Sequence, residues 1–431
     1  MPPNNKFLRH KKSAIALFAV VLLCIFTTTA QALPSFARQT GEACTACHIQ
    51  TQGSNLTPRG RDFKLKGYTE GEGNGLPPLS MVINGGGVLD LTDRNDNYGN
   101  ANRDRSFFNG SLFYAGKIFG SVGAYIEGSY ALDPDSGSSK GVLNKVDLRF
   151  ANQVKVAGQQ VNYGVSVNNE PGVQDLWNTN AVWNSVIGAP YGAILADRRL
   201  SGNVGGATLY AMINDLLYIE AGGYASLPND VQRAIGRDSY YGSVDGAIPY
   251  WRIALQHNWD GHYVSLGHFG LQADLQPSNY YDGVTHESYS DLGVDATYQY
   301  LANPEHIFEL KGRYVQETRI GTKTASNYYG AYYPSSYKYE STVDTFNVGG
   351  TYTWQQTLGL AVGYQQYSSS ANANDLELVT TELSYTPFGK QHSLLAPWLN
   401  LRLNLGYIAD VSKTTYAASN ETLYLNGRLA F

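Results

Sequence analysis

The chain has 431 residues with 46 glycines and 33 tyrosines, and only 16% of its residues are charged. Glycine is well above the roughly 7% of average proteins, which argues against an ordinary soluble enzyme. After residue 30, no apolar run approaches the roughly 18 residues of a membrane helix, so a helical membrane protein is excluded. The formal net charge of −5, with no basic block, argues against nucleic acid as a partner.

Residues 1–32 have the pattern of a secretion signal. Four basic residues precede an uninterrupted apolar stretch from Ala14 to Phe26, which is too short to cross a bilayer, and Ala30-Gln31-Ala32 supplies the small-x-small cleavage pattern. Cleavage after residue 32 removes four positive charges and Cys24, so the mature charge is −5 − 4 = −9. The alternative is an uncleaved anchor helix.

The two cysteines of the mature chain lie in the stretch Cys44-Thr45-Ala46-Cys47-His48, which fits the pattern of covalent c-type haem attachment. Two thiols at this spacing can add to the two vinyl groups of one porphyrin edge, and the adjacent imidazole can bind the iron. A thioredoxin-like pair requires a βαβ context. A plain disulfide leaves His48 unexplained, and zinc requires further ligands, whereas the next histidine is His257. We therefore predict one covalent haem c, anchored at Cys44 and Cys47, with His48 as the proximal iron ligand.

The second axial ligand is less clear from the sequence. The segment from Leu33 to Tyr68 has no methionine and no second histidine. Met81 is the nearest thioether candidate for the distal ligand, with Lys64 and Lys66 as weaker alternatives. The competing interpretation is that Met81 is simply a buried or rim-facing strand residue.

From residue 80 onward, short segments with period-two alternation are separated by clusters of Gly, Asn, Asp and Ser. Connections between these segments alternate between long and short, which is typical of outer-membrane barrels with long external loops and short periplasmic turns. The pattern predicts an all-β transmembrane barrel of about sixteen antiparallel strands rather than a soluble sandwich. The expected strand starts are Met81, Phe107, Val122, Val146, Asn162, Asn203, Leu217, Trp251, His262, Asp291, His306, Val343, Leu358, Leu378, Leu399 and Leu423.

The two faces of these segments differ in polarity. In the stretches 308–314 and 399–405, apolar or aromatic residues alternate with charged or amide residues. An Arg or Lys facing lipid at mid-membrane would cost about 2–4 kcal/mol, so the polar face must point into the lumen. The terminal Phe431 on an alternating last strand also looks like the recognition signal of the barrel-assembly machinery.

These patterns divide the chain into a signal peptide (1–32), a small helical or irregular monohaem cytochrome c segment (33–77) and the outer-membrane barrel (78–431). A segment of about 45 residues rarely folds alone, and a sixteen-strand barrel has room for a small plug. We expect the haem segment in the lumen or at the periplasmic mouth. The loop 170–202 is a candidate constriction loop, whose Trp177 and Trp183 we expect to fill the barrel rather than pack on the haem.

The sequence resembles the fused outer-membrane cytochrome–porins, whose best-known members are extracellular Fe(II) oxidases. The resemblance rests on residues 34–41 leading into the haem motif, on 56–64 with Gly67-Tyr68, and on the barrel stretch 168–179. It implies that electrons pass from Fe(II) at the cell surface to periplasmic carriers, and that Cys44, Cys47 and His48 bind the haem. The stretch 49–55 lacks the Phe-Pro pair associated with the iron oxidisers, which leaves other donors open.

Three hypotheses follow from these features. The first is a redox conduit that oxidises Fe(II) or another extracellular donor, which would make the protein an oxidoreductase. The second is a haem-plugged porin for small solutes, and the third is a cytochrome that the barrel only anchors at the surface. The expected partners are an extracellular electron donor, a periplasmic electron carrier and outer-membrane lipid. Outer-sphere electron transfer requires no catalytic acid, base or nucleophile.

Overall fold

The computed structural model describes residues 33–73, 75–91, 104–132, 139–179, 200–237, 243–276, 284–324, 336–370, 372–412 and 421–431. The expected secretion signal and its cleavage site lie outside these residues. No helix in the described part is both long and apolar enough to cross a membrane.

The described strands form one closed antiparallel ring, because β1 pairs with β2 on one side and with β17 on the other. The short strand β8 and the strand β9 pair with successive residues of β10, so together they occupy one position of the ring. The barrel therefore has sixteen strand positions, as predicted. The bounds are β1 Leu79–Asp90, β2 Arg105–Phe119, β3 Val122–Leu132, β4 Ser139–Val156, β5 Gln159–Asn168, β6 Val204–Ile213, β7 Leu217–Ser226, β8 Ser243–Asp245, β9 Ile248–Trp259, β10 His262–Gln276, β11 Val284–Tyr300, β12 His306–Thr324, β13 Ser336–Trp354, β14 Leu358–Ser369, β15 Asn372–Tyr385, β16 Asn400–Asp410 and β17 Glu421–Ala430.

The barrel is apolar outside and polar inside, as the alternation predicts. On β12, Phe308 and Leu310 are exposed on the outer face. Glu309, which lies between them, and Arg313, which lies further along the strand, are buried. On β16, Leu403 and Leu405 are exposed, while Asn404 is buried. In a closed ring, each strand forms backbone hydrogen bonds with a neighbour on both sides, so no strand edge is left exposed to lipid. Together with the apolar exterior, this makes the fold a transmembrane β-barrel.

Within the described residues, three short helices precede the first strand: α2 (Pro34–Thr40), α3 (Cys44–Cys47) and α4 (Pro58–Leu65). Helix α2 begins with a proline, whose missing N–H costs nothing at this position, and ends at Gly41 in the left-handed conformation with φ of 72°. Helix α4 also begins with a proline, and the Thr57 side chain caps it by accepting a hydrogen bond from the Gly60 N–H. A further helix, α5 (Asn229–Ala234), follows β7.

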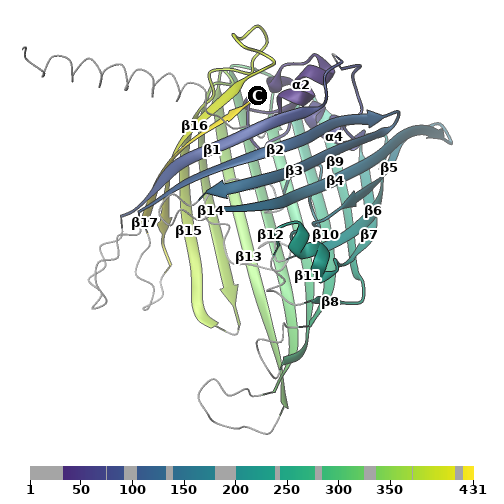
Figure 1. Cartoon of the computed structure of the whole chain (residues 1–431), viewed down its shortest axis with the longest axis vertical. Coiled ribbons are helices and arrows are strands. Elements are labelled where there is room, and N and C mark those ends of the chain that lie inside the picture. Colours follow the sequence, from purple (N-terminus) through teal and green to yellow (C-terminus); the bar gives the residue numbers. More distant parts are fainter. Residues whose placement is uncertain are drawn as a thin grey trace, which may run out of the picture.

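The helical segment lies inside the end of the barrel that carries the short turns. Figure 1 shows α2 and α4 beside the C-terminus at this end, opposite the end at which β8 lies. Hydrogen bonds join the segment to strands and turns on all sides of the ring. Its partners there include Ser80 of β1, Lys117 of β2, Asp147 and Arg149 of β4, Tyr210 of β6, Gln299 of β11, Lys311 of β12, Thr357 of the β13–β14 turn, Ser384 of β15 and Asn400 and Arg402 of β16.

Candidate functional site

A cavity lies between the helical segment and the barrel wall. Cys44, Cys47 and His48 all contribute to its lining. The other lining residues are mostly apolar or aromatic: Leu33, Phe36, Ala37, Thr40, Glu42, Ala43, Gly53, Ser54, Leu56, Gly60, Phe63, Lys64, Tyr68, Tyr125 and Asn178.

The His48 imidazole lines this cavity, and the residue as a whole is half-buried. Burial lowers the pKa of His48 to about 4, although the backbone of Gly53 works in the opposite direction. The ring is therefore neutral at pH 7, which is the state that binds a metal ion. Its Nδ1 atom is buried and has no hydrogen-bond partner among the described residues. A buried polar atom without a partner calls for an explanation, and a group bound in this cavity would supply one.

Both cysteines are free thiols. Burial raises the pKa of Cys44 to about 11 and, together with the nearby Glu42, that of Cys47 to about 12. Both thiols are therefore protonated at neutral pH in the folded chain. Helix α3 and helix α4 lie very close together at Gly60. A Cβ atom added to Gly60 would lie only 2.2 Å from the Cys47 carbonyl oxygen. Only glycine at this position allows α4 to pack on the cysteine helix.

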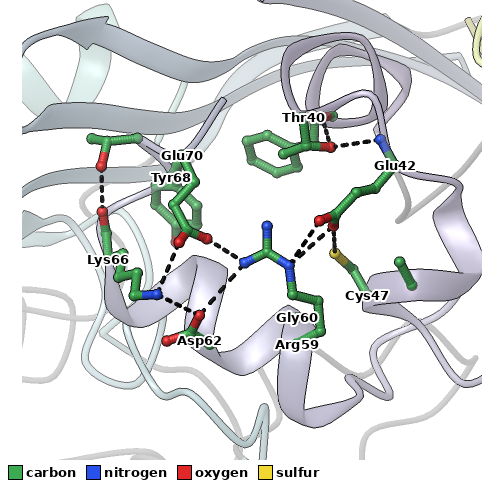
Figure 2. A network of polar contacts seen from close by, with 12 residues as sticks. Thr40, Glu42, Cys47, Arg59, Gly60, Asp62, Lys66, Tyr68 and Glu70 are labelled. Carbon is green, nitrogen blue, oxygen red and sulfur yellow. Dashed lines mark hydrogen bonds and ion pairs between the residues drawn. The ribbon is translucent and has the colours of Figure 1, made fainter. Parts of the chain in front are cut away.

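A network of charged side chains lies beside the cavity and includes the lining residue Glu42 (Figure 2). Arg59 is its centre: the guanidinium donates to both oxygens of Glu42, at 3.1 and 3.0 Å, and also to Glu70. Burial alone would lower the pKa of Arg59, but the bonds to these two carboxylates outweigh it and raise the pKa. Lys66 joins Asp62 to Glu70 at 2.7 and 2.8 Å. These ion pairs fix the chain on both sides of α4.

Two buried residues of the segment attach the inner side of the cavity to the barrel. The Tyr68 hydroxyl donates to Asp147 of β4 at 2.7 Å, and the Lys64 amine donates to the Asp175 carbonyl at 2.6 Å and to Asn178 Oδ1 at 2.8 Å. Burial and the neighbouring positive charge of Arg149 hold the pKa of Lys64 well below its usual value. Lys64 was a weaker candidate for the second axial ligand, and the structure places it in the cavity lining.

The structure does not bring Met81 to this cavity. On β1, Met81 is 38% exposed on the outer face, whereas its neighbours Ser80 and Val82 are buried. Its cross-strand partner Leu112 is 59% exposed, and its backbone pairs with the terminal Phe431. These neighbours place Met81 in the apolar outer band, so the thioether ligand expected from the sequence is not part of the site. Lys66 does not line the cavity either, because its amine is held by Asp62 and Glu70.

The first part of the expected constriction loop folds into the lumen. Residues 170–177 are buried, and the Trp177 indole N–H donates to Tyr263 at 2.6 Å. The Trp177 ring also packs edge-on against Tyr218 and under the Arg252 guanidinium. Trp177 does not line the cavity, so it fills the barrel as expected. Trp183 lies outside the described residues.

Three residues near the site were not named as site residues from the sequence, although Asn178 lies in the stretch 168–179 that carries the family resemblance. Tyr125 of β3 and Asn178 of the inward loop complete the cavity wall, and Asn400 of β16 contacts the Cys44 thiol. Asn178 also donates to the Ser54 carbonyl at 2.8 Å, which ties the inward loop to the segment. No local pattern at these positions indicates their role, because their proximity to the cysteines arises only from barrel closure.

The residues present fit a covalently held haem. Two thiols separated by two residues, a neutral imidazole with an unpartnered nitrogen, and a mostly apolar cavity wall meet at one place. Among the described residues, no group of three or more His, Cys, Asp or Glu side chains is placed to hold a metal ion, so the zinc alternative gains no support.

No protein-family model matches the chain, and no curated protein matches it. Among solved structures, an anion-selective porin from Comamonas acidovorans shares 14% identity with a TM-score of 0.46 and covers 82% of this chain and 98% of its own. OprB of Pseudomonas putida, in a high-pH structure, shares 13% identity with a TM-score of 0.46, covering 90% and 100%. A Salmonella typhi OmpF complex with daunomycin shares 13% with a TM-score of 0.43, covering 81% and 96%. These TM-scores and identities are too low to support an argument. The fold of this barrel is therefore described from the strand pairings of this chain alone.

Proposed function

We propose that this protein is a bacterial outer-membrane cytochrome–porin fusion that moves electrons from an extracellular donor to periplasmic carriers. One observation carries the proposal: Cys44, Cys47 and His48 line a single cavity at the mouth of a transmembrane barrel. A pore for solutes has no use for that combination, whereas haem attachment requires it.

The proposed location follows from the barrel. Closed barrels with an apolar exterior belong to the bacterial outer membrane, and their short turns face the periplasm. The helical segment lies at the short-turn end, so the cavity faces the periplasmic side under this proposal. Outer-membrane lipid then surrounds the apolar band that includes Leu310, Leu403 and Leu405.

The chain's own residues provide the fixed parts of the site. Cys44 and Cys47 provide thiols for thioether bonds, and neutral His48 provides a lone pair for the iron. A haem c bound there would supply a one-electron redox centre. Phe36 stacks on Tyr68 with ring centroids 5.5 Å apart, and both rings belong to the cavity wall.

The contacts between the helical segment and the barrel would block the passage of solutes while leaving a path for electrons. The segment is bonded to strands around the ring, and Arg149 and Arg252 are buried in the lumen beside it. This packing occupies the short-turn half of the lumen around these residues. We propose Fe(II) as the donor because the resemblance of the sequence implies it; oxidised iron would then stay outside the cell.

The second candidate is a haem-plugged porin that passes small solutes. The partly exposed inward side chains Asn347 and Gln365 favour it, because they give one side of the barrel a polar inner surface above the segment. Conductance in planar bilayers separates the two proposals. An electron conduit passes little current with the segment in place, whereas a porin passes steady current.

The decisive experiment uses the matured, detergent-solubilised protein and stopped-flow visible spectroscopy with anaerobic Fe(II). Rapid growth of a reduced c-type α-band supports the iron-facing conduit. Reduction by dithionite but not by Fe(II) removes iron as the donor and keeps the cytochrome–barrel. Loss of covalent haem in Cys44→Ser/Cys47→Ser is the matched control, and a wild-type protein without covalent haem overturns the proposal.

A second experiment asks whether the barrel does more than anchor the cytochrome. The protein is placed in liposomes that contain a trapped electron acceptor, and the donor is added outside. Reduction of the trapped acceptor supports a transmembrane conduit. Reduction of only an acceptor added on the donor's side supports the anchored cytochrome instead.

A further inference from the structure

The outer face of the barrel has an apolar groove across strands β13 to β17, here called the leucine groove. Its floor is a row of direct cross-strand partners: Tyr352, Leu360, Leu383, Leu405 and Leu425. The four leucines of this row are between 40% and 60% exposed. They belong to the apolar exterior of a transmembrane barrel, so the leucine groove opens toward lipid.

A second row bounds the leucine groove on the side of the short turns. It consists of the cross-strand partners Trp354, Leu358, Tyr385 and Leu403. Trp354 and Tyr385 are 43% and 44% exposed. Exposed Trp and Tyr at one level of a barrel are typical of the membrane–water interface. The groove therefore extends from the interface into the apolar band.

The leucine groove is long enough to cover one acyl chain. A row across five strands contains four spacings of roughly 4.8 Å, which makes about 19 Å. One leaflet contributes about 15 Å, half of the roughly 30 Å hydrocarbon core. The strands of such barrels are tilted by roughly 35–45°, so the row crosses the leaflet obliquely. An acyl chain that lies along the row therefore contacts leucines over its length.

The connection between the two middle strands of the groove differs from its neighbours. Residues 386–399 join β15 to β16, whereas residues 120–121 suffice to join β2 to β3 at the same end of the barrel. The connection 386–399 contains no aspartate or glutamate but carries Lys390. Its Leu394 is 76% exposed and its Trp398 is 50% exposed. Apolar and aromatic side chains beside a lysine are typical of a segment that lies at a membrane surface.

Helix α2 adds a second cation at this end of the groove. The Arg38 guanidinium lies 5.3 Å from the centroid of the Trp398 ring. Lysine and arginine beside a membrane surface attract anionic headgroups. We propose that the leucine groove and the connection 386–399 form a binding site for one anionic phospholipid. Its acyl chain lies along the leucine row, and its phosphate is bound by Lys390 and Arg38.

The groove is tested by native mass spectrometry of the detergent-purified protein with added phosphatidylglycerol. The variant Leu383→Ala/Leu405→Ala shortens two direct partners in the groove floor. The matched control is Leu255→Ala/Leu266→Ala, which shortens direct partners of β9 and β10 that are 50% and 61% exposed. The groove variant should weaken binding of the first lipid about tenfold through lost contacts, and the control should change it little. Equal binding by the two variants means that lipid only coats the outer face, which overturns the site.

The headgroup is tested by comparing phosphatidylglycerol with the zwitterionic phosphatidylcholine. Lys390→Gln should lower the preference for phosphatidylglycerol about fivefold, because it removes one cation beside the headgroup. Lys155→Gln is the control, since Lys155 is exposed at the same end of the barrel. A preference that Lys390→Gln leaves unchanged rejects the anionic site. Lys390 lies outside the strand ladder, so this measurement decides the question even if the leucine variant does not fold.

A second copy of the chain is the other occupant that these experiments detect. In that case the wild type would be an oligomer without bound lipid, and Leu383→Ala/Leu405→Ala would be a monomer, which overturns the lipid site. The inference does not depend on the proposed function, because neither the groove nor Lys390 lines the cavity of the cysteines. The same lipid measurements in the haem-free Cys44→Ser/Cys47→Ser protein keep the two conclusions separate.

Discussion

Arg149 connects three parts of the molecule that are distant in sequence. Its guanidinium pairs with Asp147 at 2.8 Å on the barrel wall, donates to the Lys64 carbonyl of α4 at 3.0 Å, and donates to the Gln174 carbonyl of the inward loop at 2.7 Å. The side chain is only 1% exposed. Replacing it by alanine should release the helical segment from the barrel without dissolving the strand ladder.

The size of the effect follows from what Arg149→Ala leaves behind. Asp147 becomes a buried carboxylate without its cation, which costs about 3–5 kcal/mol when one partner of a buried pair is removed. The Lys64 and Gln174 carbonyls each lose a charge-assisted donor, at roughly 1–3 kcal/mol apiece. Even a net loss of about 3 kcal/mol raises the undocked fraction of the segment by roughly a hundredfold.

The assay combines single-channel conductance with limited proteolysis of residues 33–77. Arg149→Ala should show frequent open events and rapid cleavage of the segment, while the barrel keeps its heat-stable migration on gels. The control is Arg319→Ala, an inward arginine paired with Glu317 of the same strand. If Arg149→Ala conducts and resists protease like the wild type, the arginine does not hold the segment and the reasoning fails.

Further predictions concern the cavity itself. Gly60→Ala places a methyl group against the Cys47 carbonyl and should destabilise the docked segment by about 1–3 kcal/mol, whereas Gly128→Ala, with open space around it, should change the denaturation midpoint little. In the haem-free folded protein, a pKa of about 11 leaves Cys44 about one-thousandth thiolate at pH 8, so alkylation followed by mass spectrometry should accelerate about tenfold per pH unit up to pH 10. A rate that levels off near pH 8.5, as in the unfolded chain, would contradict this burial. In the matured protein, His48→Ala should keep the covalent haem on denaturing gels but change its visible spectrum, and an unchanged spectrum would exclude His48 as the iron ligand.

Strand positions were predictable because the outer and inner faces have opposite polarity. Every expected start lies within an observed strand or one residue before it. The starts expected at Val146, Asp291 and Val343 are each seven residues late, because β4, β11 and β13 begin at positions 139, 284 and 336. These first residues are rich in Ser, Tyr, Thr and Lys, which resemble a loop when no apolar face alternates with them.

The candidate site was predictable only where its residues are adjacent in sequence. The Cys-x-x-Cys-His spacing identified Cys44, Cys47 and His48, which the structure brings to one cavity. The Met81 prediction used distance along the chain and ignored strand parity, which directs alternate side chains to opposite faces. Tyr125 and Asn400 were not predictable, because strand register over the whole ring brings Tyr125 to the cavity and Asn400 to the Cys44 thiol.

A short connection of residues 66–78 joins the helical segment to β1. This connection fixes the number of segments per barrel and favours the docked state of the segment. One chain supplies one barrel and one plug, so no barrel is made without its own segment. A short tether gives the docking partners an effective concentration of about millimolar, so contacts far weaker than those observed would keep the segment docked. Tyr68 and Gln39, which bond across this connection, shorten the tether further. Docking of the segment is therefore independent of how many molecules the cell makes.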